Sequence, residues 1–475
     1  MKSKFIFLLI IIFNCFTAQA QKTKPEVIKA IDSKYDQYSS IAHKIWEYAE
    51  VGFQETQSSA LLQEVLSKEG FKIESSVAGM PTAFIATYGT GKPVIGILGE
   101  YDALPGVAQE AVPELKPIAN QKAGHACGHH LFGTASAAAA IEVKNWLTAN
   151  KKQGTIRFYG TPAEEGGSGK VYLVRDGLFK DVDVVFHWHP SPINSASAGT
   201  SLANKNGKFR FYGIASHAAA SPERGRSALD AVEAMNDMVN MMREHVTQET
   251  RIHYVITRGG EAPNVVPAFA EVYYYVRHPK RTEVKDVWER ISRAAQGAAM
   301  GTDTKVEIEV TGGVYDMLPN ETLARVVDNN LRAIGGYTYT EPEKIFAEKI
   351  QQTFQAPVPS LSMTNSIGAF QTYAGSASTD VGDVSWVVPT AGLGTATWVP
   401  GTAAHSWQAV AAGGTSIGHR GMIMAAKTMA SSIIDVYTNP IVIEEAWKEL
   451  RNRTGADFKY DALIGDRKPA LDYRK

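Results

Sequence analysis

The stretch PVIGILGEYDALPG, residues 93–106, is an apolar run that ends in acidic side chains. Two later stretches have the same form: TIRFYGTPAEEGGSGK, residues 155–170, and VDVVFHWHP, residues 182–190. Each run is short and bounded by turn residues, as buried β-strands are. The polar side chains at the ends of the three runs are Glu100, Asp102, Glu164, Glu165, His187 and His189.

Helices are predicted before and between these runs. Residues 25–70 have apolar positions at helical spacing and read as helix up to Gly70, and residues 130–150 and 169–176 read as helices between the runs. Strands that alternate with helices indicate an α/β fold with a parallel-rich sheet. Ligands bind at the carboxyl ends of the strands in such a sheet. We therefore expect the polar side chains at one edge, next to the GHACGHHLFG stretch of residues 124–133.

A change of pattern after residue 205 predicts a second domain. Residues 206–312 read as strand, helix, strand, strand, helix, strand, which is the order of a ferredoxin-like βαββαβ unit. The α/β pattern then resumes. We therefore expect one catalytic domain in two parts, residues 21–205 and 313–475, with the ferredoxin-like unit inserted between them.

The N-terminus, MKSKFIFLLIIIFNCFTAQAQ, reads as a signal peptide over residues 1–20. Lys2 and Lys4 precede an apolar run that is short for a membrane span, and residues 18–20 form a small-residue cleavage site. The alternative is an uncleaved membrane anchor. We expect an exported, periplasmic protein.

Cysteine usage and charge restrict the function further. The chain has two cysteines, and Cys15 lies in the predicted signal peptide, so Cys127 is the one thiol expected after cleavage. A lone thiol in an oxidising compartment requires an explanation, of which burial is the simplest. The formal charge of −1, from 48 basic and 49 acidic residues, gives no electrostatic reason to expect nucleic acid or a membrane as partner.

Side chains from several separate loops suggest a metal centre. Thiolate, imidazole and carboxylate groups form a ligand set typical of zinc and also open to manganese, cobalt or nickel. The candidate side chains are too many for one tetrahedral zinc with an open position, and they suit two metals that share a bridging ligand. One carboxylate of the Glu-Glu pair can bind metal while the other acts as general base, and spacing does not distinguish them. The candidates are Cys127, His129, Glu164, Glu165, His189 and His405.

Eight motifs occur in order along the chain: EYDALPG, GHACGHHLFGTASAAAA, PAEEGGSGK, WHP, SHAAASPERGRSALDAV, PNVVP, STDVGDVSW and HSWQAVAAGGTSIGHRGM. Together they resemble the aminobenzoyl-glutamate hydrolase and amino-acid-conjugate amidohydrolase branch of the aminoacylase/glutamate-carboxypeptidase metallopeptidases. The resemblance covers roughly residues 36–440. It implies a di-metal catalytic domain with an inserted domain that serves as lid and dimerisation surface.

The resemblance also implies roles for individual residues. The two divalent ions per chain, Zn or Mn with Co or Ni as alternatives, would be shared by a bridging Cys127 thiolate, which coordination also protects from oxidation. Glu164 would be the general base, and His217 of the lid would stabilise the oxyanion. Asn264 and Arg277 are similar to lid residues that hold a substrate carboxylate. The implied metal ligands are Cys127, His129, Glu165, His189 and His405.

One position departs from the family pattern. The family usually has Asp or Asn where this sequence has His130. His130 can cap the following helix, hydrogen-bond a ligand, or alter metal preference, and we favour a supporting role over that of a sixth ligand. We expect His125 to be buried or to support a ligand.

Three further polar residues have open roles. His187 points the same way as His189 only if the strand continues regularly through both, and the resemblance favours His189 as the ligand. Asp102 and Asp380 are open to turn or cap roles, or to orienting a ligating histidine.

The sequence as a whole predicts a metal-dependent amidohydrolase. We expect its substrate to be a small carboxylate-bearing amide, such as an aminobenzoyl-glutamate-like compound, an N-acyl amino acid or a dipeptide, and its assembly to be a homodimer or a heterodimer with a related subunit. One alternative is an exported cysteine hydrolase using Cys127 with a nearby histidine, which leaves Glu164, Glu165, His189 and His405 unexplained. Another is a non-catalytic solute-binding protein, which has no need of a general base.

Overall fold

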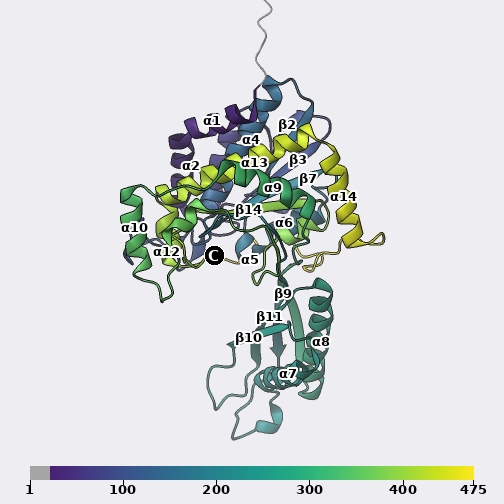
Figure 1. The fold of residues 1–475 in the computed structure, drawn as a ribbon. Coiled ribbons are helices and arrows are strands. Elements are labelled where there is room, and N and C mark those ends of the chain that lie inside the picture. Colours follow the sequence, from purple (N-terminus) through teal and green to yellow (C-terminus); the bar gives the residue numbers. More distant parts are fainter. Residues whose placement is uncertain (1–21, 475) are drawn as a thin grey trace, which may run out of the picture.

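The computed structural model describes residues 22–474, so the predicted signal peptide lies outside the described residues. A small domain, residues 203–314, projects from a large domain formed by residues 22–202 and 315–474 (Figure 1). The first strand of the small domain begins at Ala203 and its last strand ends at Val314.

A six-stranded sheet forms the centre of the large domain. The three apolar runs are β3, β6 and β7, and β6, β3, β7 and β14 lie parallel to one another, as the alternation of strands and helices predicts. β1 and β2 are antiparallel to their neighbours, because the short connection of residues 91–93 reverses the chain between β2 and β3. In spatial order the strands are β1 (Lys72–Ser75), β2 (Phe84–Thr90), β6 (Gly154–Gly160), β3 (Val94–Gly99), β7 (Val184–Ser191) and β14 (Thr390–Ala396).

Helices cover both faces of this sheet (Figure 1). One face packs against α1 (Lys24–Ser33), α2 (Tyr35–Tyr48), α4 (His129–Ala149), α9 (Glu321–Ile334) and α13 (Ser416–Thr438). The other packs against α6 (Gly169–Arg175), α11 (Val381–Ser385) and the segment after α14 (Ile441–Thr454). The Ala-rich α4 is buried almost all round, because it lies between the sheet and α13.

Residues 25–70 do not form one helix as predicted. They form α1, α2 and α3 (Thr56–Lys68). The chain leaves the helical path at Ala49, whose φ is 44°, and the residues up to 55 lead it to the carboxyl edge of the sheet. Helical periodicity continues across such a break, because each helix buries one face on the same core.

The small domain consists of one antiparallel sheet with two helices on one face. Its elements are β9 (Ala203–Tyr212), α7 (Ala228–Met242), β10 (Arg251–Arg258), β11 (Phe269–His278), α8 (Arg281–Gly301) and β12 (Lys305–Val314). The strands lie in the order β10-β11-β9-β12. Alternate residues such as Phe209, Tyr274 and Val276 face the helices, and the opposite face of the sheet is polar.

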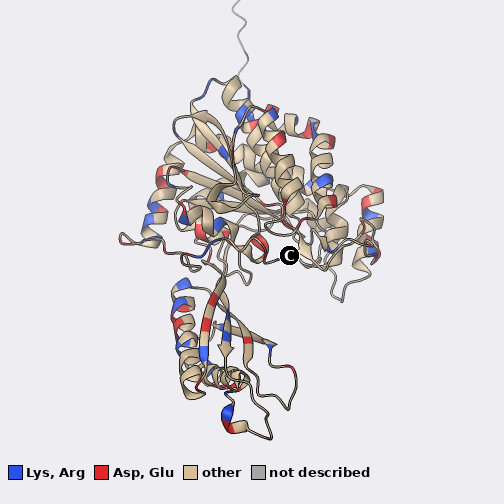
Figure 2. Cartoon of the chain, turned by 180° about the vertical axis from the view of Figure 1, so that it is seen from behind, with Lys and Arg blue, Asp and Glu red and all other residues tan. Residues whose placement is uncertain are grey.

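Shorter elements complete the chain. They are η1 (Val77–Gly79), β4 (Leu104–Pro105), β5 (Ala123–Gly124), α5 (Glu164–Gly167), β8 (Ala198–Gly199), η2 (Pro222–Arg224), η3 (Arg243–His245), α10 (Glu341–Gln351), η4 (Leu361–Asn365), β13 (Thr372–Tyr373) and α12 (Trp407–Gly413). Basic and acidic residues are interspersed over both domains in the view of Figure 2. Across residues 22–474, no helix has both the length and the apolarity needed to cross a membrane.

Candidate active site

The structure brings the five predicted metal ligands together in two groups that share one sulfur. Potential ligand atoms of Cys127, His129 and His189 lie within 4.8 Å of one another, and so do those of Cys127, Glu165 and His405. Cys127 Sγ lies 3.4 Å from His189 Nε2, and Glu165 Oε1 lies 3.1 Å from His405 Nε2. A sulfur common to two such groups can bridge two cations.

The loop that carries Cys127 is held against two other loops. Gly128, with φ at 77°, is the N-cap residue before α4, and a Cβ added there would lie 2.7 Å from Pro190 Cβ at the end of β7. Glycine is therefore required both by the turn and by the close approach of β7. On the other side, the His405 backbone N–H donates to the Ala126 carbonyl at 3.0 Å. These contacts bring three distant segments to one edge of the sheet.

Three buried atoms at this edge make no hydrogen bond within residues 22–474: His129 Nε2, Glu165 Oε1 and Glu100 Oε2. His129 Nε2 lies 3.0 Å from Glu100 Oε2. Glu165 Oε1 likewise lies 3.1 Å from His405 Nε2, so each of the three atoms has a close polar neighbour but no aligned hydrogen bond in the described part of the chain. A buried polar atom without a hydrogen bond costs on the order of 1–3 kcal/mol. Two of these atoms belong to predicted ligands, so the residues present fit a bound cation.

Several acids share the same buried region. Burial raises the pKa of the Cys127 thiol well above its usual value. Burial, followed by the neighbouring Glu100 and Glu165 carboxylates, likewise raises the pKa of Glu164 well above its usual value. A positive charge among these groups would favour their ionised forms, so this donor set attracts a cation.

Asp102 orients His129 and the Glu165 backbone. One carboxylate oxygen lies 2.9 Å from His129 Nδ1, and the other accepts the Glu165 N–H at 2.9 Å. Burial acts to raise the pKa of Asp102, but His129, the Glu165 N–H and the Lys170 charge together outweigh burial, and the pKa lies below its usual value. The contact directs His129 Nε2 toward the centre of the site. The contact with His129 fits the orienting role open for Asp102, and the contact with the Glu165 N–H fits its turn or cap role.

Asp380 contacts a lysine instead of a histidine. Lys170 is fully buried, and its Nζ lies 2.6 Å from Asp380 Oδ1 and 2.6 Å from Glu100 Oε1. Burial would lower the pKa of Lys170, but Asp380 and Glu100 outweigh burial and raise it, so Lys170 is charged. Sequence reasoning missed Lys170, although the GGSGK motif contains it, because its two partners come from other parts of the chain.

Glu164 lies beside the two groups that share Cys127. One of its carboxylate oxygens lies within 4.8 Å of His129 and Glu100 atoms. The Glu100 carboxylate is paired with Lys170 in an ion pair. The Glu164 carboxylate, in contrast, is half-buried at the margin of the site. A carboxylate in this position can accept a proton from a molecule bound between the loops.

The turn that carries Glu164 and Glu165 is strained. Ala163 and Ser168 have φ values of 56° and 58°, a region that costs non-glycine residues on the order of 1–3 kcal/mol each. Glu55 supports the turn, because its Oε1 accepts the Ala163 N–H at 2.8 Å. Burial, then the Asp102 charge, raise the pKa of Glu55 to about 8. Sequence reasoning missed Glu55 because it lies in a different part of the chain.

His130 has a supporting role away from the predicted ligands. Its Nε2 lies 3.0 Å from the Gly413 carbonyl at the end of α12, and its ring centroid lies 4.9 Å from that of His125. His125 Nε2 in turn lies 2.9 Å from the Ile45 carbonyl. Burial lowers the pKa of His125 to about 3 and that of His130 well below its usual value, so both rings are neutral. They tie α4 to α2 and α12.

His187 lies on the same face of β7 as His189, because the strand pairs regularly with β14 through both residues. It lies deeper, against Gly392, where an added Cβ would come within 2.4 Å of its Nε2. Burial, followed by the charge of His189, lowers its pKa to about 3. The structure therefore places His189, and not His187, beside Cys127.

The predicted lid residues do not lie together. His217 and Asn264 are exposed neighbours at the end of the small domain far from the large domain, where the Ala218 N–H donates to the Asn264 carbonyl at 3.0 Å. Arg277 lies at the other end of β11, opposite Asn204 near the domain connection. At about 3.4 Å per residue, the ten residues of β11 separate the two ends by roughly 30 Å. One chain therefore does not combine Asn264 and Arg277 in one carboxylate site, because they lie at opposite ends of one strand.

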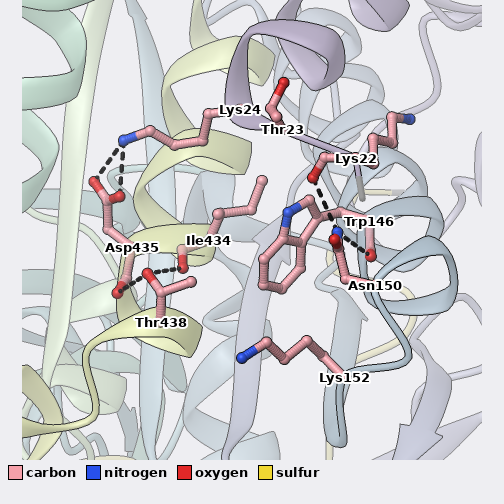
Figure 3. A pocket seen from close by; sticks show the side chains of 9 residues that line it. All are labelled: Lys22, Thr23, Lys24, Trp146, Asn150, Lys152, Ile434, Asp435 and Thr438. Carbon is pink, nitrogen blue, oxygen red and sulfur yellow. Dashed lines mark hydrogen bonds and ion pairs between the residues drawn. The ribbon is translucent and has the colours of Figure 1, made fainter. Parts of the chain in front are cut away.

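A cavity of about 470 Å³, whose lining residues are drawn in Figure 3, includes Lys152 at the amino end of β6. Glu164, by contrast, follows the carboxyl end of the same strand. Lys22 and Lys24 at its rim are each paired with a carboxylate, Glu142 and Asp435, at 2.7 Å. This cavity is not part of the candidate active site.

Comparison with known proteins is consistent with this geometry. Residues 96–380 match peptidase family M20/M25/M40. The chain is 41% identical to one of the subunits of p-aminobenzoyl-glutamate hydrolase of Escherichia coli (strain K12), over 88% of this chain and 93% of that protein. It is 29% identical to the Xaa-Arg dipeptidase of Mus musculus, over 91% of this chain and 93% of that protein.

A solved structure shares the fold. The Bacillus subtilis YxeP protein, described as a dinuclear metal binding peptidase of the M20 family, superposes with a TM-score of 0.58 at 17% sequence identity. The match covers 86% of this chain and 99% of that protein.

Proposed function

Because the chain belongs to peptidase family M20/M25/M40, we propose that it is a metal-dependent amidohydrolase for a small substrate that carries a carboxylate. It is a hydrolase that acts on amide bonds. The observation that carries the metal dependence is the pair of ligand groups that share Cys127. A cysteine hydrolase would use the Cys127–His189 contact but would leave Glu165 and His405, which converge on the same sulfur, without a role.

In this proposal His129 and His189 would hold one divalent ion and Glu165 and His405 would hold the other, with Cys127 available to both groups. When bound, two such ions supply Lewis acidity toward the amide carbonyl and toward a water molecule. Zn or Mn suits the thiolate, imidazole and carboxylate set, with Co or Ni as alternatives. The dinuclear description of YxeP, which shares the fold, supports the count of two.

Glu164 acts as the general base in this mechanism. Its carboxylate takes the proton of the attacking water and delivers it to the nitrogen of the leaving amine. Its place beside His129 supports this role, and its neighbour Glu165 is turned toward His405. Asp102 holds His129 in place through its Nδ1, and Lys170 holds Glu100 through an ion pair.

We further propose that the ferredoxin-like small domain serves as lid and dimerisation surface. His217 lies at its far end, so His217 reaches the catalytic edge of a second subunit and donates to the oxyanion there. The edge strand β10 supports pairing, because Val255 and Ile256 are exposed on it and Met241 is exposed on the adjacent α7. The second subunit is another copy of this chain or a related protein, as suggested by the Escherichia coli relative, which is named as one subunit of its hydrolase.

The named activities of the relatives indicate the substrate class. They are hydrolysis of p-aminobenzoyl-glutamate and of Xaa-Arg dipeptides, both of which carry a free carboxylate beside the amide. Arg277, near the domain connection, is the proposed carboxylate partner in the same subunit, and Asn264 accompanies His217 from the other. We propose that the protein acts after export, as its N-terminal sequence predicts.

Metal content provides the direct test. Purified protein should contain up to two divalent ions per chain and should lose activity in chelator, because the attacking water needs Lewis-acid activation. Elemental analysis and a chelation series followed by addition of Zn, Mn, Co or Ni would measure this. Full activity of rigorously metal-free protein would contradict the proposal.

A substrate panel tests the second part. We expect hydrolysis of at least one compound among aminobenzoyl-glutamate, N-acyl amino acids and dipeptides, and loss of activity when the free carboxylate is replaced by an amide. The matched esters or amides serve as controls. Equal rates for the acid and amide forms would contradict carboxylate recognition.

A further inference from the structure

The segment after α14 returns to the candidate active site along the sheet face that carries α6. The Tyr460 hydroxyl donates to Asp383 Oδ1 at 2.7 Å, and Arg175 donates to the carbonyls of Gly465 and Arg467. Gln54 then donates to the Leu471 carbonyl at 2.7 Å. Figure 1 marks the C-terminus beside α5, the turn of Glu164 and Glu165. The segment is therefore guided to the site by contacts along its length.

Tyr473 and Arg474, the last two described residues, bind the backbone of Glu165, one of the proposed metal ligands. The Tyr473 hydroxyl donates to the Glu165 carbonyl oxygen at 3.0 Å, and Arg474 Nη2 donates to the same oxygen at 2.8 Å. The Tyr473 ring packs edge-on against Phe53, with ring centroids 5.7 Å apart. An added Cβ on Gly52 would lie 2.2 Å from the Tyr473 hydroxyl, so the space for that hydroxyl requires glycine.

Both sides of the Glu165 residue are held. Its N–H donates to Asp102 Oδ2 at 2.9 Å, and its carbonyl accepts from Tyr473 and Arg474. The flanking backbone is strained at Ala163 and Ser168, and strained turns persist only where their surroundings hold them. The Glu165 carboxylate itself, by contrast, has a buried Oε1 that lies 3.1 Å from His405 Nε2 without an aligned hydrogen bond within residues 22–474.

We propose that Tyr473 and Arg474 are positioning residues that hold the Glu165 carboxylate toward His405. This rests on the proposed function, in which Glu165 and His405 hold one of two metal ions. Neither tail residue contacts that ion or the scissile bond. They act through the Glu165 carbonyl, in the way that hydrogen-bond partners of metal ligands set the geometry of a metal site. The C-terminal segment thereby supports the candidate active site without entering it.

The test uses the full chain with Tyr473→Phe, Arg474→Gln and the double substitution. Tyr473→Phe keeps the ring against Phe53 and removes only the hydroxyl. We expect the weaker of two metal-binding steps to lose affinity by roughly 10–100-fold, while the tighter step is unchanged. Calorimetric titration of metal-free protein with Mn²⁺ or Co²⁺ measures both steps. The kcat should fall at limiting metal and recover at saturating metal.

Two matched variants complete the test. Arg474→Lys keeps a charged donor and should restore part of the lost affinity. Arg451→Gln removes an exposed arginine from α14 and should leave both binding steps unchanged. The positioning role is overturned if Tyr473→Phe and Arg474→Gln bind both metal equivalents as the parent does. It is also overturned if they weaken both steps equally and lower the unfolding temperature of metal-free protein.

Failure of the proposed function would look different. In that case the parent chain itself would bind no pair of divalent ions, or would hydrolyse amides in their absence. A parent with two binding steps and metal-dependent activity, together with insensitive tail variants, would contradict the positioning role alone.

Discussion

Glu164→Gln should lower kcat by roughly 10²–10⁴-fold, because the amide cannot accept the proton of the attacking water. The metal content should stay at the parental value, since Glu164 lies outside both groups that share Cys127. The change keeps the size of the side chain and removes a carboxylate from a half-buried position beside Glu100 and Glu165. Turnover and elemental analysis of the same preparation measure the two effects together.

Glu165→Gln is the matched control for this prediction. The two residues are adjacent, yet Glu165 Oε1 faces His405 Nε2 at 3.1 Å. Its substitution should lower metal occupancy as well as activity. If Glu164→Gln empties the site while Glu165→Gln keeps both ions, the roles assigned to the two carboxylates are reversed.

His217→Ala should lower kcat by roughly 10²–10³-fold, since one lost donor to an oxyanion costs about 2.7–4 kcal/mol of barrier. The side chain is exposed at the far end of the small domain, so metal content and unfolding temperature should not change. A loss at least as large is expected from a chain that lacks residues 206–312, because that deletion also removes Asn264 and Arg277. Steady-state kinetics with metal analysis would measure it, and a parental rate for His217→Ala would contradict the oxyanion role.

A mixing experiment shows which protomer supplies His217. Cys127→Ala has an incomplete metal site but an intact His217, and His217→Ala has the reverse. If the protomers exchange freely in a homodimer, a mixture should recover about one quarter of the parental activity, because half the dimers contain one complete site. No recovery from a mixture with proven exchange would place His217 in the site of its own protomer.

Much of the site follows from local sequence. Three apolar runs ending in polar residues predicted three parallel strands, and their carboxyl ends do meet. Strand pattern depends on residues two apart, so it can be read without the rest of the fold. The residues that hold the site in place were harder to predict. Lys170 and Glu55 bond to groups on other strands and loops, and no local pattern marks such partners.

Helix breaks and the lid illustrate the same limit. The turn at Ala49 leaves the helical periodicity of residues 25–70 intact, so the break was not visible in the pattern. Asn264 and Arg277 are only 13 positions apart in the chain, yet a strand extends them to opposite ends of the small domain. A short separation in sequence therefore does not mean that these two side chains lie close together in the fold.

The amino-acid sequence alone identifies the chemical groups, the α/β class and the family resemblance, because these depend on residue type and short-range spacing. Three features required the folded chain: the sulfur common to two ligand groups, the placement of His217 away from its own catalytic edge, and the contact of Tyr473 and Arg474 with Glu165. Each depends on how segments far apart along the chain are arranged. Such arrangements arise only when the sheet and its two covered faces bring distant loops to one edge.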